Sequence, residues 1–433
     1  MRLPLMSLWS WPLVLLLWWG SAVTAAAPPA GEDLAAAVAT VASKGADDNA
    51  VHKAKRLLIA HGGGALEVVG PPLLKAVADK QQDLMVRMNA ADVLGQMRPP
   101  APAAGPALVA IATDPTDRVR ASAALALGQM KYGEPPAIDA LAALLAERDK
   151  ELRTVAATAL GCIGAPAVAG LSALLRTCDD HDRSVRFAAI TAVGRLGPPA
   201  AAAAQPLLLT RLRAPDELDR AAAADALGQL GEASPEVVAA LATALADPAP
   251  DVRKAAAEGL GAAGPPAAAA APALEQAAKD PATRLIAQVA LARITRSPDA
   301  LAALRQIAID DDADQAVFDG IDKLGRDGVP ILIEVVRADR QSAGRAIQSL
   351  GRLGSAARPA VPVLIDLLKA GRTAGRRTRF DASLAAVAQL GPAARDAAPV
   401  LRQIAPTLDS DEAKAKVADA LRAIEQSEPS TRP

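Results

Sequence analysis

The sequence predicts an all-α protein, built as an α-solenoid of about twelve helical hairpins. The phrase V-R-x-x-A-A-x-x-L-G recurs along the 433 residues. Aromatic residues make up only 2% of the chain although 51% is hydrophobic, which is unlike a large compact core. The last Gly of the phrase, or its equivalent, serves as a marker, and most markers are 33 or 34 residues apart: Ala60, Gly95, Gly128, Gly161, Gly194, Gly228, Gly261, Ala292, Asp322, Gly351, Ala388 and Arg422. Such a period indicates a repeat architecture.

Each repeat is expected to contain two helices. In the second helix, apolar residues stand nine, five, four and one before the marker, as in Val185, Ala189, Ile190 and Val193, which is helical spacing. An acidic residue is expected to cap this helix at Asp83, Asp117, Asp149, Asp182 and Asp216. A glycine three after the marker is expected to end it in a left-handed conformation, at Gly164, Gly197, Gly231, Gly264, Gly325, Gly354 and Gly391.

The marker glycine itself needs a reason, because Gly inside a helix costs about 1 kcal/mol relative to Ala. A close approach of the neighbouring helix would supply one. We therefore expect Gly161→Leu to destabilise the protein strongly and Gly161→Ala to have a mild effect.

A basic residue stands eight positions before the marker in seven consecutive repeats: Arg87, Arg120, Arg153, Arg186, Arg220, Arg253 and Arg284. We interpret these residues as a structural ladder, in which each guanidinium bridges to an Asp near the turn of its own or an adjacent repeat. The alternative is an arginine stripe that binds phosphate or acidic partners. The balanced charge, 47 basic against 48 acidic residues, favours the ladder.

The first 27 residues resemble an export signal. Met1-Arg2 is followed by the apolar run from Leu13 to Trp19, and Ala22 to Ala25 offers a small-x-small cleavage pattern. We expect residues 1–27 to be a cleaved Sec-type signal peptide and the mature protein to be periplasmic or secreted, without a membrane span. Retention of the segment as an anchor is the alternative.

Composition argues against several function classes. A formal net charge of −1 lacks the basic excess of a nucleic-acid binder. With two cysteines and three histidines, only Cys178 and His181 lie close together, and Asp310, Asp312 and Asp314 lack the Gly and Glu that complete a calcium loop. The two cysteines are expected to be too far apart for a disulfide. We predict no metal, no cofactor and no catalytic residues.

The repeats resemble HEAT repeats, specifically the short-period type found in the phycobilin-lyase family. The resemblance rests on an Asp followed by Val-Arg at the start of the second helix and on its closing pattern, as in Asp182 to Arg186 with Ala192 to Gly197, and Asp251 to Arg253 with Gly259 to Gly261. It implies a right-handed solenoid whose second helices line the concave side. We assign residues 28–425 to it: 28–280 regular, 281–390 irregular and 391–425 a C-terminal cap, with 426–433 a disordered tail.

On this basis the candidate function is a non-catalytic scaffold that binds a protein or peptide along its concave face. Residues one after the marker form a row there, with Phe187 as an added aromatic, and the candidate contacts are Gln96, Gln129, Phe187, Arg195, Gln229, Arg293, Arg352 and Gln389. A second row, three before the marker, includes Asp225, Glu258 and Asp319. The alternatives are a merely solvated helix face, a chromophore- or cofactor-handling protein of the phycobilin-lyase type, and a structural spacer of the cell envelope. The partner and the oligomeric state stay open.

Overall fold

The computed structural model describes residues 31–61, 64, 66–98, 100, 101, 103–310, 313, 315–371, 377–408 and 410–426. These residues form helices joined by turns, with no strand among them, so the all-α prediction is confirmed. The predicted signal peptide at 1–27, residues 427–433 of the predicted tail, and Asp312 and Asp314 lie outside the described residues. No helix in the described part is long and apolar enough to cross a membrane.

The chain forms two compact units, and the boundary along the sequence lies between Leu141 and Ala142. The first unit contains three hairpins, and its helices are α2 (Gly31–Val41), α3 (Asp48–His61), α4 (Leu66–Ala78), α5 (Leu84–Gln96), α6 (Ala104–Thr113) and α7 (Arg120–Gln129). The boundary falls within α8 (Pro135–Leu144).

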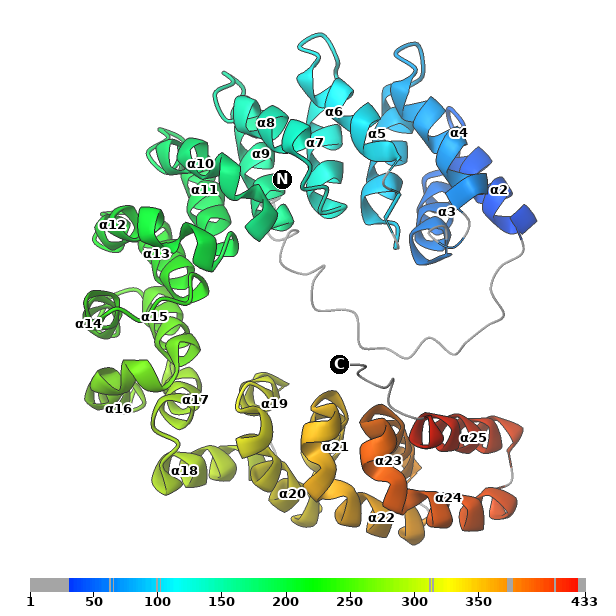
Figure 1. Cartoon of the computed structure of the whole chain (residues 1–433), viewed down its shortest axis with the longest axis vertical. Helices are drawn as coiled ribbons and strands as arrows, with labels where there is room; N and C mark the ends of the chain where they lie inside the picture. Colours follow the sequence, from blue (N-terminus) through cyan, green and yellow to red (C-terminus); the bar gives the residue numbers. More distant parts are fainter. Residues whose placement is uncertain are drawn as a thin grey trace, which may run out of the picture. The chain divides into compact units, whose positions relative to one another are not determined.

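The second unit continues with α9 (Lys150–Ile163) and eight further hairpins (Figure 1). Their first helices are α10 (Leu171–Thr177), α12 (Ala201–Arg211), α14 (Pro235–Ala244), α16 (Ala271–Ala277), α18 (Pro298–Ile309), α20 (Val329–Arg337), α22 (Val361–Ala370) and α24 (Ala398–Ile404). Their second helices are α11 (Arg183–Arg195), α13 (Glu217–Gln229), α15 (Pro250–Ala263), α17 (Arg284–Thr295), α19 (Gln315–Asp322), α21 (Ala343–Arg352), α23 (Arg377–Leu390) and α25 (Asp411–Glu425). Short 3-10 turns often precede the first helix: η2 (Ala165–Gly170), η3 (Pro198–Ala200), η4 (Pro265–Ala270), η5 (Gly325–Gly328), η6 (Gly354–Ala360) and η7 (Gly391–Ala397), while η8 (Ala405–Thr407) follows α24.

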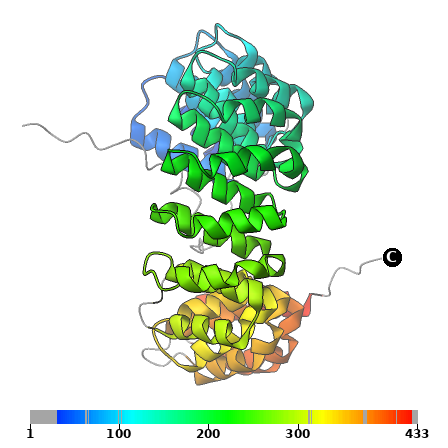
Figure 2. The same ribbon diagram turned by 90° about the vertical axis from the view of Figure 1, so that its left-hand side faces the viewer.

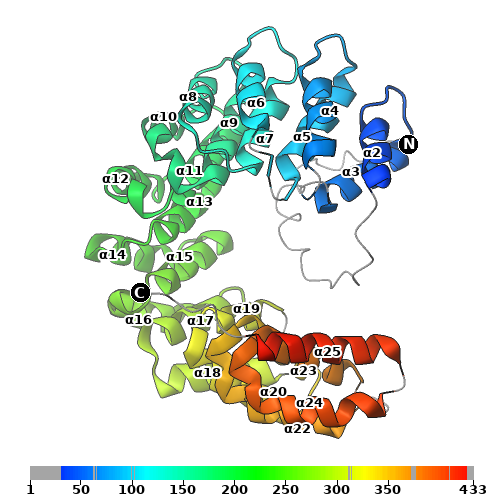
Figure 3. The same cartoon turned by 45° about the vertical axis from the view of Figure 1, so that its right-hand side comes forward.

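Within the second unit the hairpins stack as successive layers. Figure 2 shows its green helices lying one above another, and Figure 1 shows the second helices forming the inner row of the stack. Helix α25 packs on α23 and α24 and closes the C-terminal end of the described stack (Figure 3). Every one of the twelve sequence markers lies on a second helix, from Ala60 on α3 to Arg422 on α25. The repeat phase read from the sequence is therefore confirmed.

The predicted helix ends are present. Asp83, Asp149, Asp182 and Asp216 cap their helices, each accepting a backbone N–H two residues on at 2.8 to 2.9 Å. The closing glycines all have positive φ, from 53° at Gly354 to 77° at Gly164, which favours glycine. At Gly164, Gly197 and Gly264 ψ is −142° to −158°, so these three do not adopt the predicted left-handed helical conformation. Asp117 differs from the prediction, because the cap residue of α7 is Val119 and Asp117 accepts its N–H at 3.0 Å.

Six marker glycines lie where successive second helices touch: Gly95, Gly161, Gly194, Gly228, Gly261 and Gly351. A Cβ built on Gly161 would come within 2.9 Å of Cα of Ala192, and one on Gly228 within 2.5 Å of Cα of Gly259. The predicted close approach is therefore present. The expectation that Gly161→Ala is mild is wrong, because even a methyl group there meets the backbone of the next helix and one of the two helices must move.

Five of the ladder arginines bind a carboxylate of the following hairpin. Arg153 is typical: its Nε and Nη2 donate to Asp180 at 2.7 and 3.0 Å, and its Nη1 donates to the carbonyls of Glu147 and Arg148 at 2.9 Å. One guanidinium thus fixes the turn before its own helix and the turn of the next hairpin. The equivalent pairs are Arg87 with Asp117, Arg186 with Asp219 and Asp216, Arg220 with Asp247, and Arg253 with Asp280.

The remaining two ladder positions are Arg120 and Arg284. Arg120 donates from Nε to the carbonyl of Ala112 at 3.1 Å. Arg284 is exposed and forms no ion pair with a described residue, and its neighbour Thr283 is the buried residue, donating to the carbonyl of Ala277 at 2.7 Å. The assignment of Arg284 to the ladder is therefore corrected, since Thr283 holds the turn there through its hydroxyl.

Candidate binding surface on the second helices

Some residues of the predicted surface row form side-chain hydrogen bonds within the protein, and others do not. Gln96 and Gln229 each donate an amide hydrogen to the carboxylate one turn earlier, at Asp92 and at Asp225, the latter at 2.7 Å. Arg352 donates to Asp322 and to the Ser349 hydroxyl, both at 2.7 Å. These three side chains hold the row in place and offer few free donors to a partner.

Two further glutamines cover the marker glycines. The Gln129 side chain lies over Gly95, and the Gln389 side chain lies over Gly351, each reaching back to the preceding second helix. The Gln129 Oε1 atom is buried and has no hydrogen-bond partner among the described residues. Both glutamine side chains therefore pack between neighbouring second helices.

Arg195 of the row and the added Phe187 are both exposed on α11. Arg195 is exposed at the end of the helix, and Phe187 has 39% of its surface exposed, one of the few large apolar side chains in the described part to be so accessible. Both are open to contact from outside, but no hollow forms around them among the described cavities.

Arg293 lies in a hollow of about 250 Å³ on the inner row, between α15, α17 and α19. The hollow brings members of the two sequence rows together: Arg293 and Lys323 from the row after the marker, and Glu258, Val289 and Asp319 from the row before it. Arg293 is half-buried and Lys323 is exposed, and neither forms an ion pair or side-chain hydrogen bond with a described residue. Two cations of this surface are therefore available to a ligand.

Burial shapes the charges around this hollow. Desolvation raises the pKa of Glu258 and of its neighbour on the row, Asp225, and Lys323 partly opposes the rise at Glu258. Desolvation also lowers the pKa of Arg293. Each of these shifts arises because the charged form is poorly solvated. A partner of opposite charge would stabilise that charged form.

The apolar wall of the hollow was not predicted. Leu285 and Ile286 of α17 form it, together with Val289. A sequence signal exists, since Leu285 and Phe187 both stand seven before their markers, where Thr154, Ala221 and Lys254 stand in other repeats. The shared register places Phe187 on the same helix face as Leu285.

No described group of three or more His, Cys, Asp or Glu residues could hold a metal ion. Cys162 and Cys178 are both free thiols, and burial raises the pKa of Cys178 to about 12. At neutral pH that thiol stays protonated and is a poor nucleophile.

Comparison with known families decides the identity of the fold. The model for HEAT repeats matches residues 70–161, 138–207 and 205–292. Together these matches span residues 70–292, or 223 of the 433 residues. The chain is a HEAT-repeat protein. Of the helices that form its hollow, α15 lies inside the matched region, α17 begins inside it and α19 follows it.

Among solved structures, a karyopherin shares the helical fold of this HEAT-repeat protein. A mutant of Kap121p, a karyopherin, is 14% identical with a TM-score of 0.51, covering 87% of this chain and 52% of its own. The complex of CpcE and CpcF of phycocyanin lyase from Nostoc sp. PCC7120 is 29% identical with a TM-score of 0.37, covering 53% of this chain and 90% of its own. No curated protein matches the sequence.

Proposed function

We propose that this HEAT-repeat protein is a non-catalytic scaffold that binds a polypeptide segment along the second helices of its second unit. The observation that carries the proposal is the half-buried Arg293, which lacks a carboxylate partner among the described residues although it lies in a hollow. A buried cation is costly unless it is paired, so a partner carboxylate would gain from binding there.

The other groups of the hollow suit a polypeptide. Lys323 adds a second cation, Glu258 and Asp319 add acceptors for N–H donors, and Leu285 with Ile286 offers apolar contact. Such a mixture of donors, acceptors and apolar surface matches a peptide backbone with its side chains. A nucleic acid would instead need a basic excess, which the net charge of −1 does not supply.

Charge changes in the hollow are expected to remove partner binding. The tagged protein would be incubated with extract of the source cells, and bound proteins would be quantified for the wild type, Arg293→Gln and Lys323→Glu. Loss of the two cations should lower the amount of one specific partner at least tenfold, because each carboxylate contact contributes roughly 1.5–3 kcal/mol.

The matched control is Arg213→Glu, which changes an exposed arginine of the second unit outside the hollow. It should retain the partner. Equal recovery by all variants would contradict the proposal. Absorbance above 300 nm in the purified protein would favour the chromophore-handling alternative, and absence of any bound protein would favour the envelope spacer.

We also propose that the protein is exported and that its first 27 residues are removed. All four tryptophans, Trp9, Trp11, Trp18 and Trp19, lie in that segment. Protein purified from the periplasm or medium should therefore show no tryptophan emission on excitation at about 295 nm, where tyrosine absorbs little. Emission at the level of four tryptophans, or an intact N-terminal mass, would contradict cleavage.

A further inference from the structure

A row of three arginines follows the 3-10 turns of the last hairpins. Arg326 on η5, Arg358 on η6 and Arg395 on η7 each stand four residues before the proline at the second position of the next helix, namely Pro330, Pro362 and Pro399. The same register holds Val168, Pro198 and Ala268 in earlier hairpins of the second unit. Among the hairpins of the second unit that have a 3-10 turn before the first helix, positive charge at this register is thus confined to three successive ones.

All three arginines are exposed, and none has an ion pair or side-chain hydrogen bond with a described residue. This separates them from the ladder, whose arginines bind a carboxylate in the next hairpin. The shared register therefore places three unpaired positive charges along one edge of the second unit.

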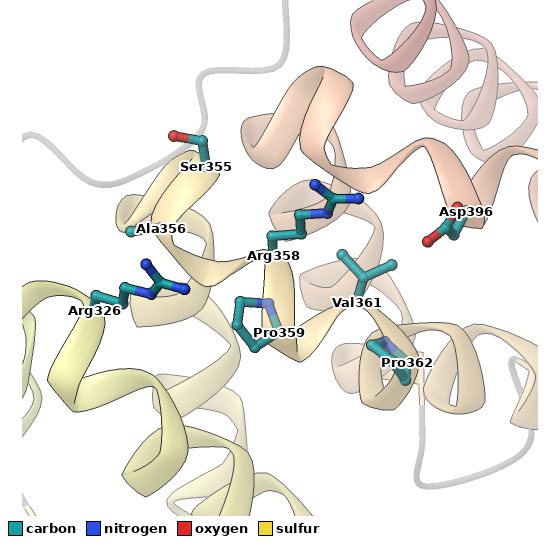
Figure 4. Close-up of a pocket in the computed structure, with 8 residues that line it drawn as sticks. All are labelled: Arg326, Ser355, Ala356, Arg358, Pro359, Val361, Pro362 and Asp396. Carbon is teal, nitrogen blue, oxygen red and sulfur yellow. The ribbon is translucent and has the colours of Figure 1, made fainter.

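An open cavity of about 560 Å³ lies at two of these arginines (Figure 4). Arg326, Ser355, Arg358 and Asp396 line it with polar groups, and Pro359 and Pro362 line it with apolar surface. In Figure 4 Arg358 lies between Arg326 and Asp396. The three turns η5, η6 and η7 all contribute, and the cavity shares no residue with the hollow on the inner row.

The arginines of this cavity can bind a carboxylate, and the Asp396 carboxylate beside them can accept an N–H hydrogen bond. Guanidinium groups bind carboxylates through paired N–H donors, and the Ser355 hydroxyl can add a further donor. Asp396 has no described partner, accepts N–H groups and repels a dianion. Pro359 and Pro362 offer flat apolar contact to a short chain, and the volume suits a ligand of a few residues.

We infer that the cavity binds an acidic peptide segment, with a carboxylate at Arg326 and Arg358 and a backbone N–H at Asp396. A carboxylate next to an N–H donor satisfies both ends of the cavity, whereas a phosphate group alone would satisfy only the arginine end. The inference concerns an edge formed by the 3-10 turns, so it does not depend on binding at the inner row.

Binding of a short acidic peptide tests this inference. A fluorescein-labelled Gly-Glu-Gly-Asp-Gly peptide would be titrated with the full chain and followed by fluorescence anisotropy, beside the same peptide with Gln and Asn. The double variant Arg326→Ala/Arg358→Ala should weaken binding of the acidic peptide at least tenfold, and the amide peptide should bind at least tenfold more weakly to the wild type. Asp396→Asn should also weaken the acidic peptide, whereas the removal of a negative charge would strengthen binding of a simple anion.

A control variant separates this site from general charge. Arg213→Ala removes one exposed arginine of the second unit outside both cavities, so it should bind the acidic peptide as the wild type does. Matching helical circular dichroism and melting temperatures would show that the variants fold. Equal binding of the two peptides, full binding by the double variant, or displacement of the peptide by an equal concentration of inorganic phosphate would overturn the inference.

Discussion

Gly228→Ala should destabilise the second unit by about 2 kcal/mol, although alanine is the better helix former. A Cβ at residue 228 would lie 2.5 Å from Cα of Gly259, so α13 and α15 must separate to admit one methyl group. The cost of that separation exceeds the roughly 1 kcal/mol that alanine gains inside a helix. Urea unfolding followed by circular dichroism at 222 nm measures the change. Gly228→Leu should have a larger effect and prevent normal stacking.

Gly344→Ala is the matched control. Gly344 also lies in a helix of the second unit, as the second residue of α21, and a Cβ there has no heavy atom within 4 Å. This substitution should leave stability unchanged or raise it by up to about 1 kcal/mol, because only the helix propensity changes. If both variants shifted the unfolding midpoint in the same direction and by the same amount, close helix contact would not be the reason for the marker glycines.

Arg153→Ala should cost about 3 kcal/mol, because it removes one partner of a nearly buried ion pair. The Arg153 and Asp180 side chains are 7% and 11% exposed. Without the guanidinium, the Asp180 carboxylate and the carbonyls of Glu147 and Arg148 lose donors that little water can replace. The same urea measurement applies, and Arg153→Lys should recover part of the loss, since it keeps the charge without the paired donors.

The comparison variant is Arg253→Ala, which removes the equivalent ladder residue from a more exposed pair. Arg253 is 19% exposed and Asp280 is 35% exposed, so water can solvate the remaining carboxylate. We expect a clearly smaller loss than for Arg153→Ala. Equal losses at the two positions would show that burial does not set the strength of the ladder.

Much of the fold could be predicted because helical hairpins repeat their signals. The marker glycines, the capping aspartates and the closing glycines each recur at one register, and a periodic pattern reports directly which face of a helix is buried. The marker of every repeat fell on a second helix for that reason, even in α19, where the marker is Asp322.

What the sequence could not predict depends on contacts between repeats. Asp219 stands nine before its marker, where Val185 stands one repeat earlier, yet it is 2% exposed and pairs with Arg186 at 2.8 Å. The hollow at Arg293 likewise depends on a contact between repeats. A Cβ on Gly320 would meet the Val289 side chain at 2.5 Å, so α17 and α19 approach closely because residue 320 is glycine. Such contacts join residues about thirty positions apart, and one repeat read alone does not contain them.

The Arg–Asp connections also bear on how the array can change in length. From Arg186 to Asp280, successive hairpins are joined by a ladder guanidinium that binds at least one carboxylate of the hairpin after it. Duplication or deletion of one such unit therefore joins a ladder arginine to a carboxylate again at the new junction. In this stretch, recombination between neighbouring repeats preserves the ladder, so the number of layers can change while this connection between layers stays the same.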